Sequence, residues 1–168
     1  MADMLRLTPH ETVTIRVSSP ELLEVEGSWG PEGKPPPPHY HPAQDEHFEV
    51  LEGTLTAKLG GEESDLEAGQ MLDIPRGTHH QIWNRGSGST RALWQTRPAG
   101  RTEEWFRSID RLIGEGRVGS NGMPGPLAFG VLLTEYRDVF RLGSAPDLVT
   151  RPLLAGLGLV GRARGYRA

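Results

Sequence analysis

Residues 33–53 read GKPPPPHYHPAQDEHFEVLEG and hold three of the six histidines of the chain. His39 and His41 are two positions apart, and side chains with this spacing leave an extended strand from the same face. Both imidazoles can therefore point at one spot. The pair supplies two ligands of a metal site, so the remaining ligands must come from other parts of the chain.

Glu46 is the nearest candidate for a further ligand, although its parity is opposite to that of His41. A regular strand would turn Glu46 away, but Pro42 and the polar residues after it favour a break or a bulge that resets the register. From Glu46 onward the parity is consistent. Phe48 and Val50 should therefore line the same interior face as the carboxylate.

A second histidine cluster lies in residues 69–84, which read GQMLDIPRGTHHQIWN. Pro75 and Gly77 predict a tight entry into a strand, from which His79 and His80 project to opposite faces. Only one of the two can look inward. This strand is the expected source of the last ligand.

Outward from the two clusters, the first 100 residues have the pattern of a β structure. Short runs rich in β-branched and aromatic residues alternate with polar residues and are separated by glycine-rich turns, including bends at Gly53 and Gly60-Gly61. The predicted strand segments are 12–17, 21–29, 47–64 (a hairpin), 70–75, 78–84 and 90–98. Their close spacing predicts a sandwich or barrel, and we expect no helix before residue 100.

After Gly100 the hydrophobic period becomes helical. Residues 102–114 place their large apolar side chains on one face, with Thr102 in a capping position. Further helices are predicted at 127–141 and, weakened by three glycines, at 150–163. We expect these helices to pack on the barrel or to form a dimer interface. We therefore divide the chain into a β region, residues 1–100, and a C-terminal helical extension, residues 101–168.

Composition excludes several classes of protein. The 168 residues suit one buried core, and 18 basic against 22 acidic residues give a net charge of −4, which makes nucleic acid an unexpected partner. No apolar run is long enough to span a membrane and no secretory signal is visible, so we expect no membrane partner and a cytoplasmic location. Because the chain has no cysteine, any metal must take nitrogen and oxygen ligands.

The two histidine clusters resemble the two motifs of the cupin superfamily. Residues 33–53 are similar to G(X)5HXH(X)3-4E(X)6G, and residues 69–84 are similar to G(X)5PXG(X)2H(X)3N, with the expected residue types in register. The positions in register are Gly33, His39, His41, Glu46 and Gly53 in the first motif, and Gly69, Pro75, Gly77, His80 and Asn84 in the second. The likeness is to small single-domain metal-binding members.

The resemblance implies a mainly β fold, a double-stranded β-helix or jelly-roll barrel, here with a C-terminal helical extension. It implies one divalent transition metal held in the cavity. The implied ligands are His39, His41, Glu46 and His80. It leaves His79 as a spacer and makes Asn84 a support of the strand end, and it favours a homodimer.

The ligand types leave the ion open. Three imidazoles and a carboxylate suit Fe, Mn, Ni, Co, Cu or Zn, whose intrinsic affinities follow a common order at any such site. Glu46 could alternatively leave the metal and act as a catalytic base. Other side chains that could reach the cavity or support the ligands are Trp83, Trp94, Asp73, Gln44, Gln81 and Gln95.

Two functions remain open on the sequence, because one fold hosts many chemistries, and a metal site that serves stability alone is a third possibility. The first is a metal-dependent enzyme, of dioxygenase or isomerase/cyclase type, acting on a small oxygen-bearing organic molecule. The second is a non-catalytic module that binds a sugar or a carboxylate. The complete ligand set and a helical region able to cap a cavity favour the enzyme.

Overall fold

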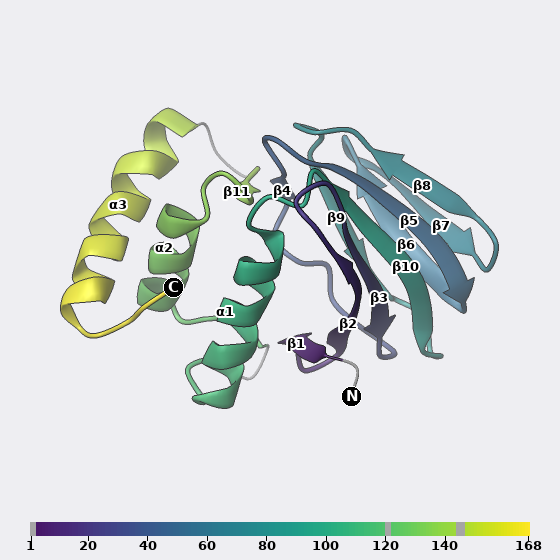
Figure 1. Ribbon diagram of the computed structural model, residues 1–168, viewed down its shortest axis with the longest axis horizontal. Helices are drawn as coiled ribbons and strands as arrows, with labels where there is room; N and C mark the ends of the chain where they lie inside the picture. Colours follow the sequence, from purple (N-terminus) through teal and green to yellow (C-terminus); the bar gives the residue numbers. More distant parts are fainter. Residues whose placement is uncertain (1–2, 120–121, 144–146) are drawn as a thin grey trace.

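The computed structural model describes residues 3–119, 122–143 and 147–168, and two antiparallel sheets form its larger part (Figure 1). The first sheet contains, in spatial order, β1 (Met4–Thr8), β2 (Glu11–Ser18), β3 (Leu23–Trp29), β10 (Thr90–Arg97), β5 (Asp45–Glu52) and β8 (Met71–Ile74). The second contains β11 (Arg141–Leu142), β4 (His39–Tyr40), β9 (His80–Trp83), β6 (Thr54–Leu59) and β7 (Glu62–Glu67). The helices are α1 (Thr102–Gly114), α2 (Pro126–Glu135) and α3 (Asp147–Ala163).

The predicted strands and the helix at 102–114 are confirmed, and within the described ranges no helix precedes residue 100. Strand β1 was not predicted. The helix predicted at 127–141 is shorter, because α2 ends at Glu135 and the chain then forms β11, which pairs with β4. Local periodicity could not reveal this long-range pairing. The helix predicted at 150–163 lies within α3.

The break predicted after His41 is larger than a bulge. Strand β4 belongs to the second sheet and β5 to the first, so the chain crosses between the sheets over residues 41–44. Pro42 lies in this crossing, where its missing N–H leaves no gap in a strand ladder. As a result His39, on β4, and Glu46, on β5, reach the interior from opposite walls.

Strand β5 alternates as predicted. The side chains of Glu46, Phe48 and Val50 are buried, with exposed fractions of 3%, 2% and 1%. His47 faces the other side, where its Nδ1 lies 2.7 Å from Oδ1 of the exposed Asp73. The sequence allows Asp73 to be a cavity acid or, as we favour, a solvated strand residue, and its exposed side chain and outward pairing confirm the latter.

Asn84 fixes the turn that precedes β10. Its side-chain amide donates to the carbonyl oxygens of Trp29, Gly30 and Gly88, and its Oδ1 accepts from the N–H of Gly86. The residue is 1% exposed, so these groups replace water for one another. The predicted supporting role of Asn84 is consistent with these contacts.

Replacing Asn84 with Ala is expected to lower the free energy of unfolding by about 2–3 kcal/mol, because several buried carbonyls lose their donor at once. Urea denaturation measures this change. The control is Gln95→Ala, whose amide makes a half-buried bond to Glu24 and should cost about 1 kcal/mol or less. Equal losses in the two variants would contradict the role of Asn84.

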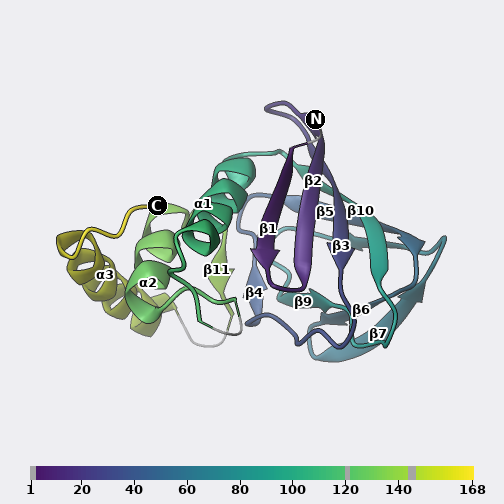
Figure 2. The same cartoon turned by 90° about the horizontal axis from the view of Figure 1, so that it is seen from below.

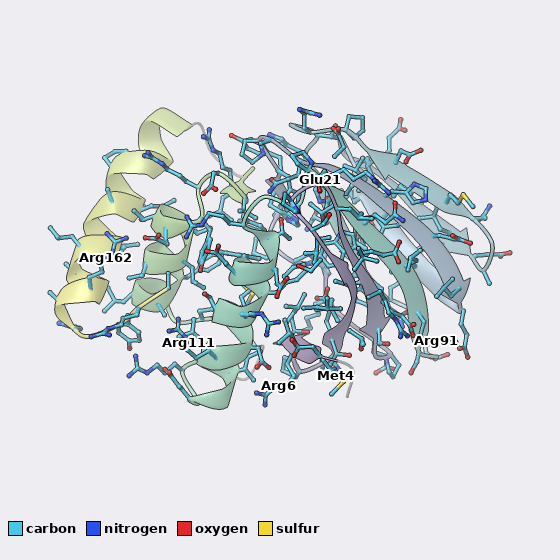
Figure 3. All side chains as sticks on the ribbon, in the orientation of Figure 1. Met4, Arg6, Glu21, Arg91, Arg111 and Arg162 are labelled. Carbon is cyan, nitrogen blue, oxygen red and sulfur yellow. The ribbon has the colours of Figure 1, made fainter. Side chains whose placement is uncertain are left out.

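The helices cover one end of the sheets (Figure 2). Helix α1 packs on β1, and its residues Trp105, Phe106 and Leu112 share a core cluster with Leu5 and Leu7 of that strand. The ion pair of Arg6, labelled in Figure 3, with Asp110 adds a partly exposed link. Helix α2 lies between α1 and α3 in both ribbon views. No helix among the described residues is both long and apolar enough to cross a bilayer.

Close contact between α2 and α3 depends on glycine. A Cβ atom on Gly130 would lie 2.7 Å from Cβ of Leu157, and one on Gly161 would lie 2.7 Å from the carbonyl oxygen of Leu127. Of the three glycines that weaken the predicted helix, Gly158 and Gly161 thus let it approach α2, whereas a Cβ on Gly156 would meet nothing within 4 Å.

Candidate metal centre

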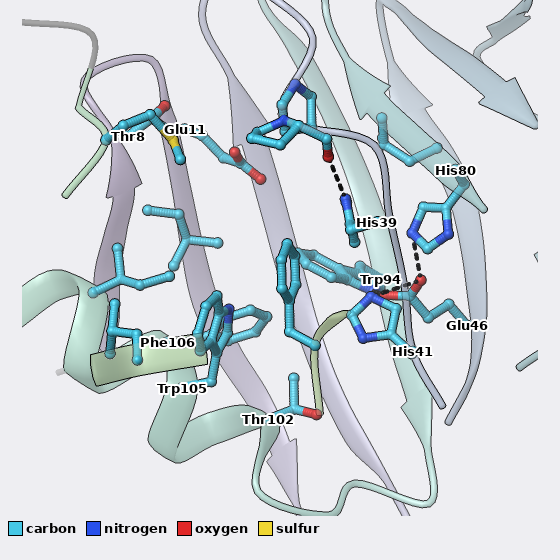
Figure 4. Close-up of a pocket in the computed structure, with 18 of the residues that line it drawn as sticks. Thr8, Glu11, His39, His41, Glu46, His80, Trp94, Thr102, Trp105 and Phe106 are labelled. Carbon is cyan, nitrogen blue, oxygen red and sulfur yellow. Dashed lines mark hydrogen bonds and ion pairs between the residues drawn. The ribbon is translucent and has the colours of Figure 1, made fainter. Parts of the chain in front are cut away.

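A cavity of about 130 Å³ lies between the sheets and the first two helices (Figure 4). Apolar cavities of roughly 150 Å³ admit a benzene-sized molecule, so this space suits a small ring. Strands of both sheets and helices α1 and α2 contribute to its wall. Aromatic residues on this wall include Trp29, Phe48, Trp94, Trp105, Phe106 and Phe140.

The four sequence-predicted ligands meet at one side of this cavity. One ring nitrogen from each of His39, His41 and His80 can be chosen so that the three atoms lie within 4.8 Å of one another. Oε2 of Glu46 lies 3.3 Å from Nε2 of His41 and 3.0 Å from Nε2 of His80. Nitrogen ligands bound at about 2.1 Å to one ion lie up to about 4.2 Å apart, so a small inward shift of the rings would complete a coordination sphere.

Backbone carbonyls orient the three rings. Nδ1 of His39, His41 and His80 lies 2.9, 2.6 and 2.9 Å from the carbonyl oxygens of Pro37, Val139 and Thr78. An Nδ1–H donor in each ring satisfies these carbonyls and leaves Nε2 with its lone pair. Metal-binding histidines are commonly held in this way, with the second ring nitrogen donating to a carbonyl or a carboxylate.

Two atoms of the cluster lack a hydrogen-bond partner among the described residues. Nε2 of His41 and Oε2 of Glu46 are fully buried, and neither makes a hydrogen bond of ordinary geometry. Unpaired polar atoms in the interior are costly. A cation bound between them would satisfy both, so the donor set fits a divalent transition metal.

Trp94 fixes the Glu46 carboxylate. Its indole N–H donates to Oε1 at 2.9 Å, which leaves Oε2 directed at the histidines. Burial opposes ionisation of Glu46, but the attraction of His41 and His80 outweighs it and lowers the pKa of Glu46 to about 2. The carboxylate is therefore charged at neutral pH. The sequence named Trp94 as a cavity candidate but could not show this bond.

The electrostatics of the histidines depend on the same carboxylate. Burial lowers the pKa of His39 to about 3, and repulsion by His80 and His41 adds to the effect. For His80, burial acts against protonation, but the nearby Glu46 carboxylate, 3.0 Å from Nε2, outweighs it and raises the pKa. His80 and Glu46 therefore favour each other's charged forms.

Phe140 brings the C-terminal region to the site. Its ring stacks on His39, with centroids 4.4 Å apart and planes inclined by 19°, and stacks on Trp105 of α1 on its other side. The neighbouring residue Val139 supplies the carbonyl that orients His41. The sequence did not predict that the region after α2 contributes to the site.

Other predicted positions lie outside the cluster. His79 is exposed and stacks on Tyr40, as expected for a spacer, and Trp83 lies on an outer groove rather than the cavity wall. The three glutamines named as candidates for supporting the ligands form hydrogen bonds elsewhere. Gln44 donates to Thr102, Gln81 to Pro36 and Gln95 to Glu24.

Comparison with known proteins agrees with this geometry. A family model described as a cupin domain matches residues 28–96, which include all four candidate ligands. Tetracenomycin polyketide synthase protein TcmJ of Streptomyces glaucescens is 40% identical over 60 residues, which are 36% of this chain and 40% of TcmJ. Oxidoreductase iacF of Pestalotiopsis fici is 44% identical over 55 residues, 32% of this chain and 27% of iacF. The chain thus spans less than half the length of both relatives.

The fold also matches solved structures. KdgF from Halomonas sp. superposes with a TM-score of 0.52 and 23% identity over 57% of this chain and 87% of KdgF. At this identity the likeness concerns the fold alone. Together with the family match, it confirms the predicted jelly roll, and the structure itself shows the C-terminal helices that follow.

Proposed function

Residues 28–96 of this chain are a cupin domain, and on that premise we propose that the domain holds one divalent transition metal through His39, His41, Glu46 and His80. The observation that carries the proposal is the convergence of three oriented imidazoles on one buried carboxylate oxygen. Each ligand has its second polar atom bonded to the protein, which prepares the site for an ion at low reorganisation cost.

We further propose that the chain is an enzyme acting on a small planar molecule that carries oxygen atoms. A bound metal would supply Lewis-acid polarisation of a carbonyl or enolate oxygen. The aromatic wall would hold the ring and exclude water, and Trp94 would keep Glu46 on the metal rather than free to act as a base. We favour isomerisation or cyclisation of a polyketide-like molecule as the reaction. The likeness to a polyketide synthase protein supports this choice.

A second candidate is oxidation of a molecule of the same kind, and the likeness to an oxidoreductase favours it. The two reactions differ in a measurable way. An oxygenase consumes dioxygen with the substrate, whereas a cyclase does not. Oxygen uptake by the protein loaded with each of Fe, Mn, Co, Ni, Cu and Zn therefore separates them.

The metal site is tested by stripping the chain with a chelator, adding back each ion singly and measuring metal after gel filtration. We expect about one ion per chain in the wild type and a loss of stoichiometric binding in His80→Ala. His79→Ala is the matched control, because this exposed neighbour lies outside the cluster and should bind as the wild type does.

The substrate class is tested on the cobalt-loaded protein, whose visible spectrum reports the coordination of the ion. Catechol and acetylacetone, each with two adjacent oxygen donors, should change the spectrum in a saturable manner. A folded wild-type chain that takes up no ion would refute the metal site. An ion that no organic ligand reaches would instead indicate a structural site or the non-catalytic alternative.

A further inference from the structure

Glu11 is an acid in a position where the strand pattern places apolar side chains. It shares the inward face of β2 with Val13, which is buried, and pairs with Trp29 on β3. Its carboxylate lines the same cavity as the candidate metal ligands. Figure 4 shows Glu11 entering this cavity from the wall opposite His80 and Glu46.

No charged side chain within the described ranges pairs with Glu11. Burial raises the pKa of Glu11 to about 7, and the nearby indole N–H of Trp29 lowers it only in part. That indole makes no hydrogen bond of ordinary geometry to any group in the described ranges. Glu11 is only half-buried by solvent exposure, but an acid facing an apolar cavity without a charge partner still costs folding free energy, so a binding role would account for its presence better than a structural role.

Glu11 also stands where the cavity meets an outer groove. Both spaces share wall residues, among them Glu11, Trp29, Pro36 and Pro37. A molecule entering through this groove would pass the carboxyl group before reaching the histidines. One end of a bound molecule would therefore lie near Glu11 while the other lies at the candidate metal centre.

We propose that Glu11 is a substrate-binding residue, which hydrogen-bonds a hydroxyl or carbonyl group at the end of the molecule remote from the metal centre. This inference rests on the proposed function for the metal-bound end. It defines the substrate class as a planar apolar body with oxygen groups at both ends. A protonated Glu11 can donate to a carbonyl, and an ionised one can accept from a hydroxyl.

The test uses planar catechols of one, two and three fused rings, each with and without a hydroxyl at the far end. Quenching of tryptophan fluorescence measures their affinity, since Trp29, Trp94 and Trp105 line the cavity. In the wild type we expect the best-fitting pair to show about a tenfold preference for the added hydroxyl. Glu11→Leu should abolish that preference, and Glu11→Gln should retain part of it.

Stability and metal content separate this inference from its alternatives. Urea denaturation of Glu11→Gln should show unchanged or greater stability, whereas a structural carboxyl would give a loss. Equal hydroxyl preference in the wild type and Glu11→Leu, or failure of every probe to bind the wild type, would overturn the inference. Measuring the probes on both the zinc-loaded and the metal-free protein keeps its outcome distinct from a failure of the metal site.

Discussion

Glu46→Gln is expected to weaken metal binding at least about 100-fold while the protein remains folded. The amide has nearly the shape of the carboxylate but lacks the charge that attracts a divalent ion and balances three imidazoles. Competition with a chromogenic chelator measures the affinity. Glu49→Gln is the matched control, because it removes the same charge from the opposite face of β5 and should keep wild-type affinity.

Trp94→Phe extends this prediction to the group behind the carboxylate. It keeps a ring in the cavity but removes the donor to Oε1 of Glu46. Removal of such an outer partner commonly costs about 10–100-fold in metal affinity, so an intermediate loss is expected. Wild-type affinity in Glu46→Gln would contradict the proposed ligand set. If Trp94→Phe binds metal with wild-type affinity, the indole of Trp94 serves only as a packing group and does not support the Glu46 carboxylate.

The sequence predicted the cluster because its signals are local. Spacing of two places His39 and His41 on one face, and alternation along β5 places Glu46 with Phe48 and Val50. Because neighbouring residues of a strand point to opposite faces, only one of His79 and His80 is expected to point inward. The period of a strand suggests the direction in each case, but only the β5 positions follow it within a regular strand, because His41 comes after β4 in the crossing between the sheets and His79 precedes β9.

The contacts that orient the cluster could not be predicted, because they join distant segments. The carbonyl bound by His41 belongs to Val139, which lies beyond α2, and Phe140 stacks on His39. The glutamine candidates do not support the ligands. Backbone carbonyls orient the rings instead, and any residue type supplies a backbone carbonyl. Glu11 carries no motif and becomes visible only when β2 folds against the cavity.

The metal-free protein is expected to lose stability as the pH falls from about 6.5 toward 3. The pKa of His39 is lowered to about 3 from an ordinary value near 6.5, so the unfolded chain binds more protons than the folded chain in this interval. Protonation therefore favours unfolding. Each unit of pKa shift corresponds to about 1.4 kcal/mol, so the total effect amounts to a few kcal/mol.

Glu46 and His80 change the stability of the fold in other pH intervals. Glu46, with its pKa lowered to about 2, adds a loss of stability as the pH falls through the interval between its ordinary value and 2. His80 has a raised pKa, so its contribution is complete below about 6.5 and decreases as the pH rises through the folded value. His39 is thus the member of the cluster that dominates between pH 6.5 and 4.5.

Urea denaturation in the presence of a chelator, at several pH values from 7 to 4.5, measures this slope. His39→Phe keeps a ring against Phe140 but removes the titrating group, so its free energy of unfolding should depend less on pH than that of the wild type. His79→Phe, at an exposed position stacked on Tyr40, is the matched control and should keep the wild-type slope. An unchanged slope in His39→Phe would show that the acid sensitivity arises outside the metal cluster.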